Sequence, residues 1–220
     1  MFRSVVSLTF VILLTFTLPA SANVSPSDRV KETVDQILQI LKDPSLSKTE
    51  RRDQVKAVVR KRFDYESMSQ VILATNWRKA TKAQREQFIV LFRELLEQTY
   101  FSAVDSYDNQ TVRMGRERLK GNLAEVQTFI ESANKELPVS YKLRYRNDDW
   151  YAYDVTVDGV SLVSNYRTSF RNLVKTKGMD GLLTELAEKV AKLKENNVQK
   201  DAQSASQDQE TAQPSASTVN

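Results

Sequence analysis

Residues 139–157, VSYKLRYRNDDWYAYDVTV, decide the class of fold. In the first half, Val, Tyr and Leu alternate with Ser, Lys and Arg, which is the pattern of a strand with one face in water. Residues 147–149, Asn-Asp-Asp, are typical of a tight hairpin turn. In the second half, the side chains predicted to share one face are Tyr151, Tyr153, Val155 and Val157. The segment therefore predicts an antiparallel hairpin.

Two more strands are expected before this hairpin, at residues 110–119 and 123–132, with Lys120-Gly121-Asn122 as the turn between them. Four consecutive strands joined by short connections predict an antiparallel meander.

Helices flank this sheet in the sequence. Apolar periodicity and capping residues predict helices over residues 25–41, 47–62, 64–73 and 82–107 before the strands, and over 161–178 and 180–194 after them. Gly178 is the expected C-cap between the last two. Helices, then a sheet, then helices predict an α+β fold, with helices packed on one face of a curved four-stranded sheet.

The helix expected at residues 82–107 has an unusually wide apolar surface, which includes Leu96, Tyr100 and Val104. A helix on the surface of a protein normally buries a narrower stripe. Two explanations remain open: either the helix is covered on two sides, or one side lines a cavity.

The two ends of the chain differ from the middle. Residues 1–22 resemble a secretory signal, with Arg3, an apolar run at 5–18 and the small residues Ala20-Ser21-Ala22. The run is shorter than the ~20 residues of a membrane span, so cleavage is favoured over anchoring. Residues 199–220 are rich in Gln, Ser, Ala and Thr and predict a disordered tail. Residues 23–198 are then a single exported domain.

Composition excludes most enzyme chemistry. The chain has no His and no Cys, so it has no disulfide, no thiol nucleophile, no Ser-His-Asp triad and no His-ligated metal. Its formal net charge of +4 is too small to indicate nucleic-acid binding. We expect no metal and no cofactor.

Three groups of carboxylates were considered as catalytic groups. Asp64 and Glu66 lie at a predicted helix start, where capping explains them, and Asp148-Asp149 lie in the hairpin turn. Asp154 lies within a strand, where it either pairs with an arginine of a neighbouring strand or acts as a base.

A basic segment lies on the first predicted strand, with Arg113, Arg116, Arg118 and Lys120. It is either a solvated edge strand or a contact for an anionic partner or a lipid headgroup.

Several short motifs occur in a specific order: FDYESM at 63–68, NWRKAT at 76–81, QREQF at 84–88, FRELL at 92–96, WYAYDV at 150–155, GVSLV at 159–163 and GMDGL at 178–182. Together they resemble the periplasmic phospholipid-shuttle family, MlaC-like, also called toluene-tolerance proteins. The resemblance covers about residues 30–195.

The resemblance implies an α+β domain of NTF2-like or cystatin-like shape whose apolar cavity encloses phospholipid acyl chains. It implies a soluble periplasmic carrier between an outer-membrane lipoprotein complex and an inner-membrane ABC transporter with a periplasmic lipid-binding subunit. Such a carrier maintains the lipid asymmetry of the outer membrane. We expect it to act as a monomer without a nucleic-acid partner.

We expect the lipid pocket to be lined by Leu96, Tyr100, Val104, Val112, Met114, Leu143, Tyr153, Val160, Leu162 and Tyr166. The resemblance implies the place of Val160 in the pocket wall and that of Arg85 on a partner-facing surface, where we also expect Arg78 and Lys79.

Two other functions fit the same fold. One is an NTF2-like enzyme that uses Asp154 or Asp64 as a base within the pocket. The other is an exported adaptor whose apolar surface binds a partner's helix or peptide.

Overall fold

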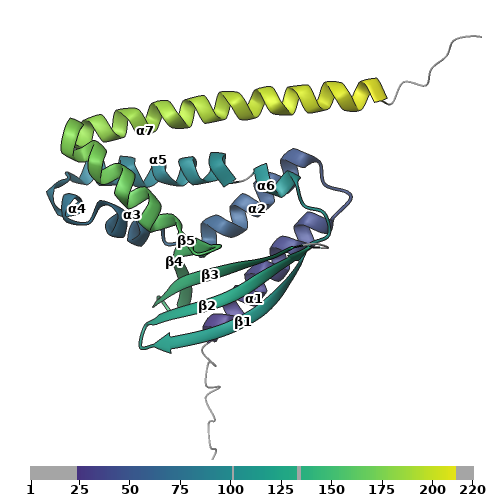
Figure 1. Ribbon diagram of the computed structural model, residues 1–220, viewed down its shortest axis with the longest axis horizontal. Helices are drawn as coiled ribbons and strands as arrows, with labels where there is room; N and C mark the ends of the chain where they lie inside the picture. The colour runs from purple at the N-terminus through teal and green to yellow at the C-terminus, as the bar shows by residue number, and fades with distance from the viewer. Residues whose placement is uncertain (1–23, 101, 133–134, 212–220) are drawn as a thin grey trace, which may run out of the picture.

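The computed structural model describes residues 24–100, 102–132 and 135–211 (Figure 1). The helices that precede the sheet are α1 (Pro26–Lys42), α2 (Lys48–Arg62), α3 (Tyr65–Leu73), α4 (Thr75–Lys79), α5 (Lys82–Tyr100) and α6 (Ser102–Asp105). The strands are β1 (Thr111–Lys120), β2 (Leu123–Ser132), β3 (Lys135–Arg146), β4 (Asp149–Val157) and β5 (Val160–Ser161), and α7 (Leu162–Thr211) follows. The predicted signal segment lies outside the described residues.

The predicted α+β class and the meander are confirmed. The strands lie in the sheet in chain order, β1-β2-β3-β4-β5, and each pairs antiparallel with its neighbour. The sheet has a fifth, two-residue strand that was not predicted. In Figure 1, α1 crosses the sheet, while α3, α5 and α7 form a helical layer beyond the β4 end.

A bulge in β4 changes the face on which its side chains lie. Lys142 pairs with Asp154 and Leu143 pairs with Ala152, so Tyr153 is the extra residue. As a result Trp150 and Ala152, at 6% and 4% exposed, lie on the buried face together with Val155. The prediction that Tyr151 and Tyr153 share the face of Val155 and Val157 is therefore wrong.

The turn between β3 and β4 has the predicted hairpin geometry, because Asn147 and Asp148 both have positive φ (50° and 59°). Asp149 does more than form a turn. It accepts hydrogen bonds from Arg29 of α1 and Arg62 of α2, each at 2.7 Å, and it therefore joins two helices to the sheet. Burial would raise the pKa of Asp149, but the bonds from the Trp150 N–H and from the two arginines hold that pKa below its ordinary value.

Two hydrophobic clusters form the core. The helical cluster is built by α3, α5 and α7 and includes Met68, Phe88, Phe92, Tyr166, Phe170 and Leu186. The sheet cluster joins α1 to the sheet and consists of Val30, Ala124, Val126, Leu143, Trp150 and Ala152. Phe63, at the end of α2, packs against both. The molecule thus has two cores that meet beside β4.

The wide apolar helix expected at residues 82–107 appears as α5 and the short α6, with residue 101 outside the described ranges. Phe88, Phe92 and Leu95 of α5 are fully buried in the helical cluster. Coverage by α3 and α7 therefore explains most of the wide apolar surface of α5.

Gly178 divides α7 at the predicted position. Its φ of 73° and ψ of −175° are not helical, and Figure 1 shows the later segment turning there and running beside α5. This later segment continues through Thr211, whereas the sequence predicts a disordered tail from residue 199. Its Gln, Ala, Lys and Glu residues favour helix, and contacts with other elements hold it; residues 212–220 lie outside the described ranges.

The later segment of α7 forms polar contacts with two other elements, α5 and α2. Lys194 donates to Glu94 of α5 at 2.9 Å, and the Asn197 side chain donates to the backbone of Gln98 at 3.0 Å. Farther along, Asp201 accepts from Arg52 of α2 at 2.5 and 2.7 Å, and the same guanidinium binds Asp105 of α6. The helix is thus attached at successive turns.

We expect the last contact to weaken at low pH. The hydrogen bonds from Arg52 lower the pKa of Asp201, so its stabilising effect is present above the ordinary carboxylate range and is lost as the pH falls through the lowered pKa. Hydrogen exchange of the backbone around residue 201 should then rise about two- to fivefold between pH 7 and pH 3, after correction for the intrinsic rate. Asp201→Asn should show the faster exchange already at pH 7. Equal corrected exchange in both proteins at both pH values would contradict this role.

Among the residues that the structure describes, no helix has the length and apolar character needed to cross a membrane.

Candidate functional site

One face of the sheet is apolar across all five strands. The register aligns a single row of side chains on this face: Met114, Thr128, Val139, Val157 and Val160. The next row consists of Val112, Ile130 and Leu137, and the row on the other side contains Val126, Tyr141 and Val155. Since opposed residues in antiparallel strands lie on the same face, these side chains form one continuous surface.

Only half of this face is used by the sheet cluster. The half near the β1–β2 and β3–β4 turns contains Leu143, Trp150 and Ala152 and packs against α1. The remaining half, which we call the distal half, consists of Val112, Ile130, Leu137, Val139, Val155, Val157 and Val160 and belongs to neither core cluster. Val139 and Val155 are nonetheless only 4% and 7% exposed. The distal half is therefore the part of the apolar face that the protein's own two cores do not use.

Two polar side chains lie at the border of the distal half. Thr128 is fully buried, and the phenol of Tyr141 is hydrogen bonded to it. Burial raises the pKa of Tyr141, and the bond with Thr128 partly offsets this. The Thr128 hydroxyl also donates to the Val139 carbonyl at 3.5 Å, so this buried polar group has a partner and the face stays suitable for apolar contacts.

The predicted pocket residues fall into three groups. Val112, Met114, Leu143 and Val160 lie on the apolar face, although Leu143 is buried in the sheet cluster and Val160 is 57% exposed. Leu96, Tyr153 and Tyr166 instead belong to or pack against the helical cluster. Tyr100, Val104 and Leu162 lie outside both clusters, on α5, on α6 and at the start of α7.

Tyr100 and Tyr166 connect the last two groups. Tyr100 is 42% exposed at the end of α5 and lies beside Tyr166 of α7. Burial is the main cause that raises the pKa of Tyr166 to about 12, and the neighbouring Tyr100 adds to the increase. The phenol of Tyr166 is therefore neutral at physiological pH.

Several lining candidates were missed by sequence reasoning, among them Leu137, Val155 and Val157. Their alternation was visible in the strand pattern, and it placed them on an apolar face. What the pattern lacked was the division of that face between residues that join a core cluster and residues that join neither cluster.

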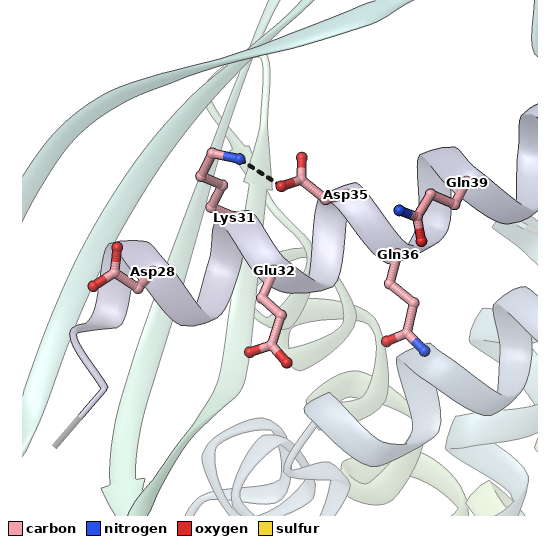
Figure 2. Close-up of a pocket in the computed structure, with 6 residues that line it drawn as sticks. All are labelled: Asp28, Lys31, Glu32, Asp35, Gln36 and Gln39. Carbon is pink, nitrogen blue, oxygen red and sulfur yellow. Dashed lines mark hydrogen bonds and ion pairs between the residues drawn. The ribbon is translucent and has the colours of Figure 1, made fainter. Parts of the chain in front are cut away.

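An open groove of about 520 Å³ lies on the outer side of α1. It is lined by Asp28, Lys31, Glu32, Asp35, Gln36 and Gln39. Figure 2 shows these polar side chains along the helix, with Lys31 paired to Asp35 at 2.5 Å. A lining of charges and amides is unsuited to hydrocarbon chains, so we do not place a lipid there.

The predicted partner residues lie around α4. Arg78 and Lys79 are exposed, whereas Arg85 on α5 is half-buried. Arg85 donates to the Arg78 carbonyl at 3.3 Å, and its guanidinium lies 5.4 Å from the ring centre of Trp77. Arg85 therefore holds α4 against α5, and Arg78 and Lys79 are the more accessible cations.

The carboxylates considered as catalytic groups have structural partners. Asp154 is 3% exposed; it accepts from Lys142 at 3.2 Å and from the Ser161 hydroxyl at 2.8 Å, and the Val163 N–H also donates to it. Asp64 caps α3 through the backbone N–H of Ser67 at 2.9 Å. The cross-strand partner of Asp154 is thus Lys142, whereas an arginine was expected from the sequence.

Asp154→Ala should lower the free energy of unfolding by about 2 kcal/mol, because it removes an N-terminal cap of α7 and leaves Lys142 without its partner. Urea denaturation measures this. Asp108, an exposed aspartate before the sheet, is the control, and Asp108→Ala should change the free energy by less than about 0.5 kcal/mol. Equal effects of the two substitutions would contradict the structural role of Asp154.

Comparisons with known proteins agree on one family. The family model for the MlaC protein matches residues 31–188. The intermembrane phospholipid transport system binding protein MlaC of Haemophilus influenzae is 26% identical over 194 residues, which cover 81% of this chain and 89% of that protein. Toluene tolerance protein ttg2D of Pseudomonas putida is 27% identical over 194 residues, covering 84% and 90%.

A solved structure has the same fold. The phospholipid-binding protein of Ralstonia solanacearum, determined in complex with a phospholipid, superposes with a TM-score of 0.70 at 26% identity, over 78% of this chain and 99% of that one. Because the family model matches well over half of the sequence, the chain belongs to the MlaC family.

Proposed function

We propose that this chain is a periplasmic phospholipid carrier. The observation that supports this most directly is the distal half of the sheet's apolar face, which lies outside both core clusters. The names of two relatives describe phospholipid transport and toluene tolerance, and the similar structure from Ralstonia solanacearum holds a phospholipid.

The acyl chains would lie along the distal half. Val160 extends this surface at the β5 edge, and Leu162 follows directly after β5. Val104 lies on α6, which leads into β1 beside Val112. These positions suggest that Tyr100, Val104 and Leu162 contribute the helical side of the pocket, while Leu96 and Tyr166 support it from the helical cluster.

The energetics require an extended apolar lining. Each methylene is worth about 0.8 kcal/mol on burial, so two chains of about 15 methylenes would cost roughly 24 kcal/mol to expose to water. A carrier must replace most of this with its own apolar surface, and a few polar contacts cannot do so. The headgroup can remain in solvent, which predicts weak headgroup selectivity.

The partners would be an outer-membrane lipoprotein complex and the periplasmic lipid-binding subunit of an inner-membrane ABC transporter. Arg78 and Lys79 are exposed cations on the short α4 and could contact such a partner. The predicted signal at residues 1–22 supports a periplasmic location. The carrier would move lipid without changing it chemically, since Asp64 and Asp154 both serve structural contacts.

A transfer assay tests the proposal. Donor vesicles contain a phospholipid with a self-quenching fluorescent headgroup, and acceptor vesicles contain none. We expect the purified protein to increase fluorescence at a rate proportional to its concentration. A rate equal to that without protein would overturn the carrier function.

A further inference from the structure

The turn between β1 and β2 carries two exposed leucines. Leu119 is 59% exposed and Leu123 is 41% exposed, and only Lys120, Gly121 and Asn122 separate them. Neither leucine belongs to the sheet cluster, so packing in the core does not account for an apolar side chain at either position. Each leucine is therefore a large apolar side chain at an exposed turn with no core contact that explains it.

The two leucines lie on opposite faces of the hairpin. Leu119 is opposed by Ala124, whereas Leu123 is opposed by Lys120. Side chains alternate along a strand and opposed residues share a face, so Leu119 and Leu123 point to different sides. A protein docked on one face would cover one leucine. An apolar environment that surrounds the turn on all sides would cover both leucines.

Cations without ion pairs accompany the leucines. Arg116, Arg118 and Lys120 lie on the edge strand β1, are exposed, and form no ion pair with any described residue. Arg113 lies farther from the turn on the same strand and differs, because it forms ion pairs with Glu131 and Glu136. The charge near the turn is therefore available to an external anion.

The acidic side chains near these cations equal them in number but do not pair with them in the described chain. Glu125 is opposed to Arg118 in the register, yet no ion pair within 4.0 Å joins them in the described chain. Glu117 accepts a hydrogen bond from the Ser27 N–H at 2.8 Å, and Asp148 lies in the adjacent β3–β4 turn.

The turn is held in a fixed position. Gly121 has a φ of 57°, which favours glycine, and the Asn122 carbonyl accepts a hydrogen bond from the Tyr145 N–H of β3 at 2.9 Å. Figure 1 shows the turn at the end of the sheet far from α5 and from the later segment of α7. It can therefore contact a flat surface without obstruction by the helical layer.

We propose that the β1–β2 turn is a membrane contact that inserts into the interface of an anionic phospholipid bilayer. Leu119 and Leu123 enter the boundary between headgroups and acyl chains, and Arg116, Arg118 and Lys120 bind the lipid phosphates. A bilayer surrounds the turn, which suits leucines on opposite faces. An acidic protein would satisfy the charges but would leave one leucine exposed.

Vesicle flotation tests the contact. We expect the protein to float with vesicles of phosphatidylethanolamine and phosphatidylglycerol, and to bind zwitterionic phosphatidylcholine vesicles at least tenfold more weakly. Arg118→Glu combined with Lys120→Glu should reduce binding at least tenfold, and so should Leu119→Thr combined with Leu123→Thr. Lys189→Glu combined with Lys192→Glu, at exposed positions of α7, is the matched control and should bind normally. Equal binding by all three variants would overturn the proposal.

A spectroscopic measurement tests insertion itself. Because the chain contains no Cys, Leu119→Cys and Leu123→Cys each provide a single site for an environment-sensitive fluorophore. Anionic vesicles should shift the emission of both labels to shorter wavelength and leave a label at Val198→Cys unchanged. A shift at only one turn position would indicate a one-sided protein-like contact, and a shift with protein concentration alone would indicate a second copy of this chain. Either result would overturn the proposal.

This contact goes beyond the carrier function and can fail separately from it. The turn variants should still release bound phospholipid on solvent extraction, because the distal half is unchanged. Loss of bound lipid from the turn variants would place the leucines in the cargo site and would contradict membrane insertion.

Discussion

Val157→Trp is expected to raise the dissociation constant for phospholipid at least 100-fold. Val157 lies in the middle of the distal half, opposite Val139 on one side and Val160 on the other, and it is half-buried. An indole ring there would occupy space that we assign to an acyl chain. If it excludes about four methylenes, the loss of binding free energy is about 3 kcal/mol.

The fold should tolerate this substitution. Val157 belongs to neither core cluster, so a larger side chain would fill the proposed lipid space and leave both cores unchanged. Thermal unfolding and far-UV circular dichroism should match those of the unchanged protein after removal of lipid. Val198→Trp, at a position 68% exposed on α7, is the matched control and should retain lipid. An unchanged dissociation constant for phospholipid in Val157→Trp would show that the chains bind elsewhere.

Phe92→Ala is expected to lower the free energy of unfolding by about 3–5 kcal/mol. Phe92 is fully buried, and its ring centre lies 5.8 Å from that of Phe88, 5.3 Å from Tyr166 and 6.3 Å from Phe170. Removing the ring would leave a cavity among three other aromatic side chains and would loosen the contact of α5 with α7. Urea denaturation measures the loss.

Val90→Ala provides the control on the same helix, because Val90 is 42% exposed and should change the free energy by less than about 0.5 kcal/mol. The Phe92 variant also distinguishes two locations for the lipid. If Phe92→Ala left stability nearly unchanged but abolished lipid binding, the helical cluster would be the cargo site, and our assignment to the sheet face would be wrong.

The alternation of apolar and polar residues in the strands predicted most of the fold. Period-two alternation in β2 and β3 predicted both strands and their apolar faces, and Gly178 predicted the break in α7. The bulge at Tyr153 could not be predicted in this way, since it depends on how Lys142 and Leu143 pair with β4. One extra residue moved Tyr151 and Tyr153 to other surroundings.

The candidate site was harder to predict than the fold. Leu96 and Tyr166 are apolar and lie on the expected helices, but contacts between α5 and α7 place them in the helical cluster. Val157 was recognised as a strand residue, yet its importance depends on which part of the sheet α1 covers. Periodicity tells which face of an element is apolar; the packing of distant elements decides whether that face is filled.

The helical extension at residues 199–211 shows a similar limit. Its composition is low in apolar residues, which predicted disorder, but local helix propensity and the contact between Asp201 and Arg52 are independent of apolar burial. Long-range polar contacts of this kind leave no periodic signal in the sequence.

Extraction of the purified protein with organic solvent, followed by mass spectrometry of the extract, tests the central claim most directly. We predict about one phospholipid per protein, with several headgroup types present, and a lower amount from Val157→Trp. An extract without phospholipid from folded protein that also takes up none from vesicles would contradict the claim that this sheet face binds acyl chains.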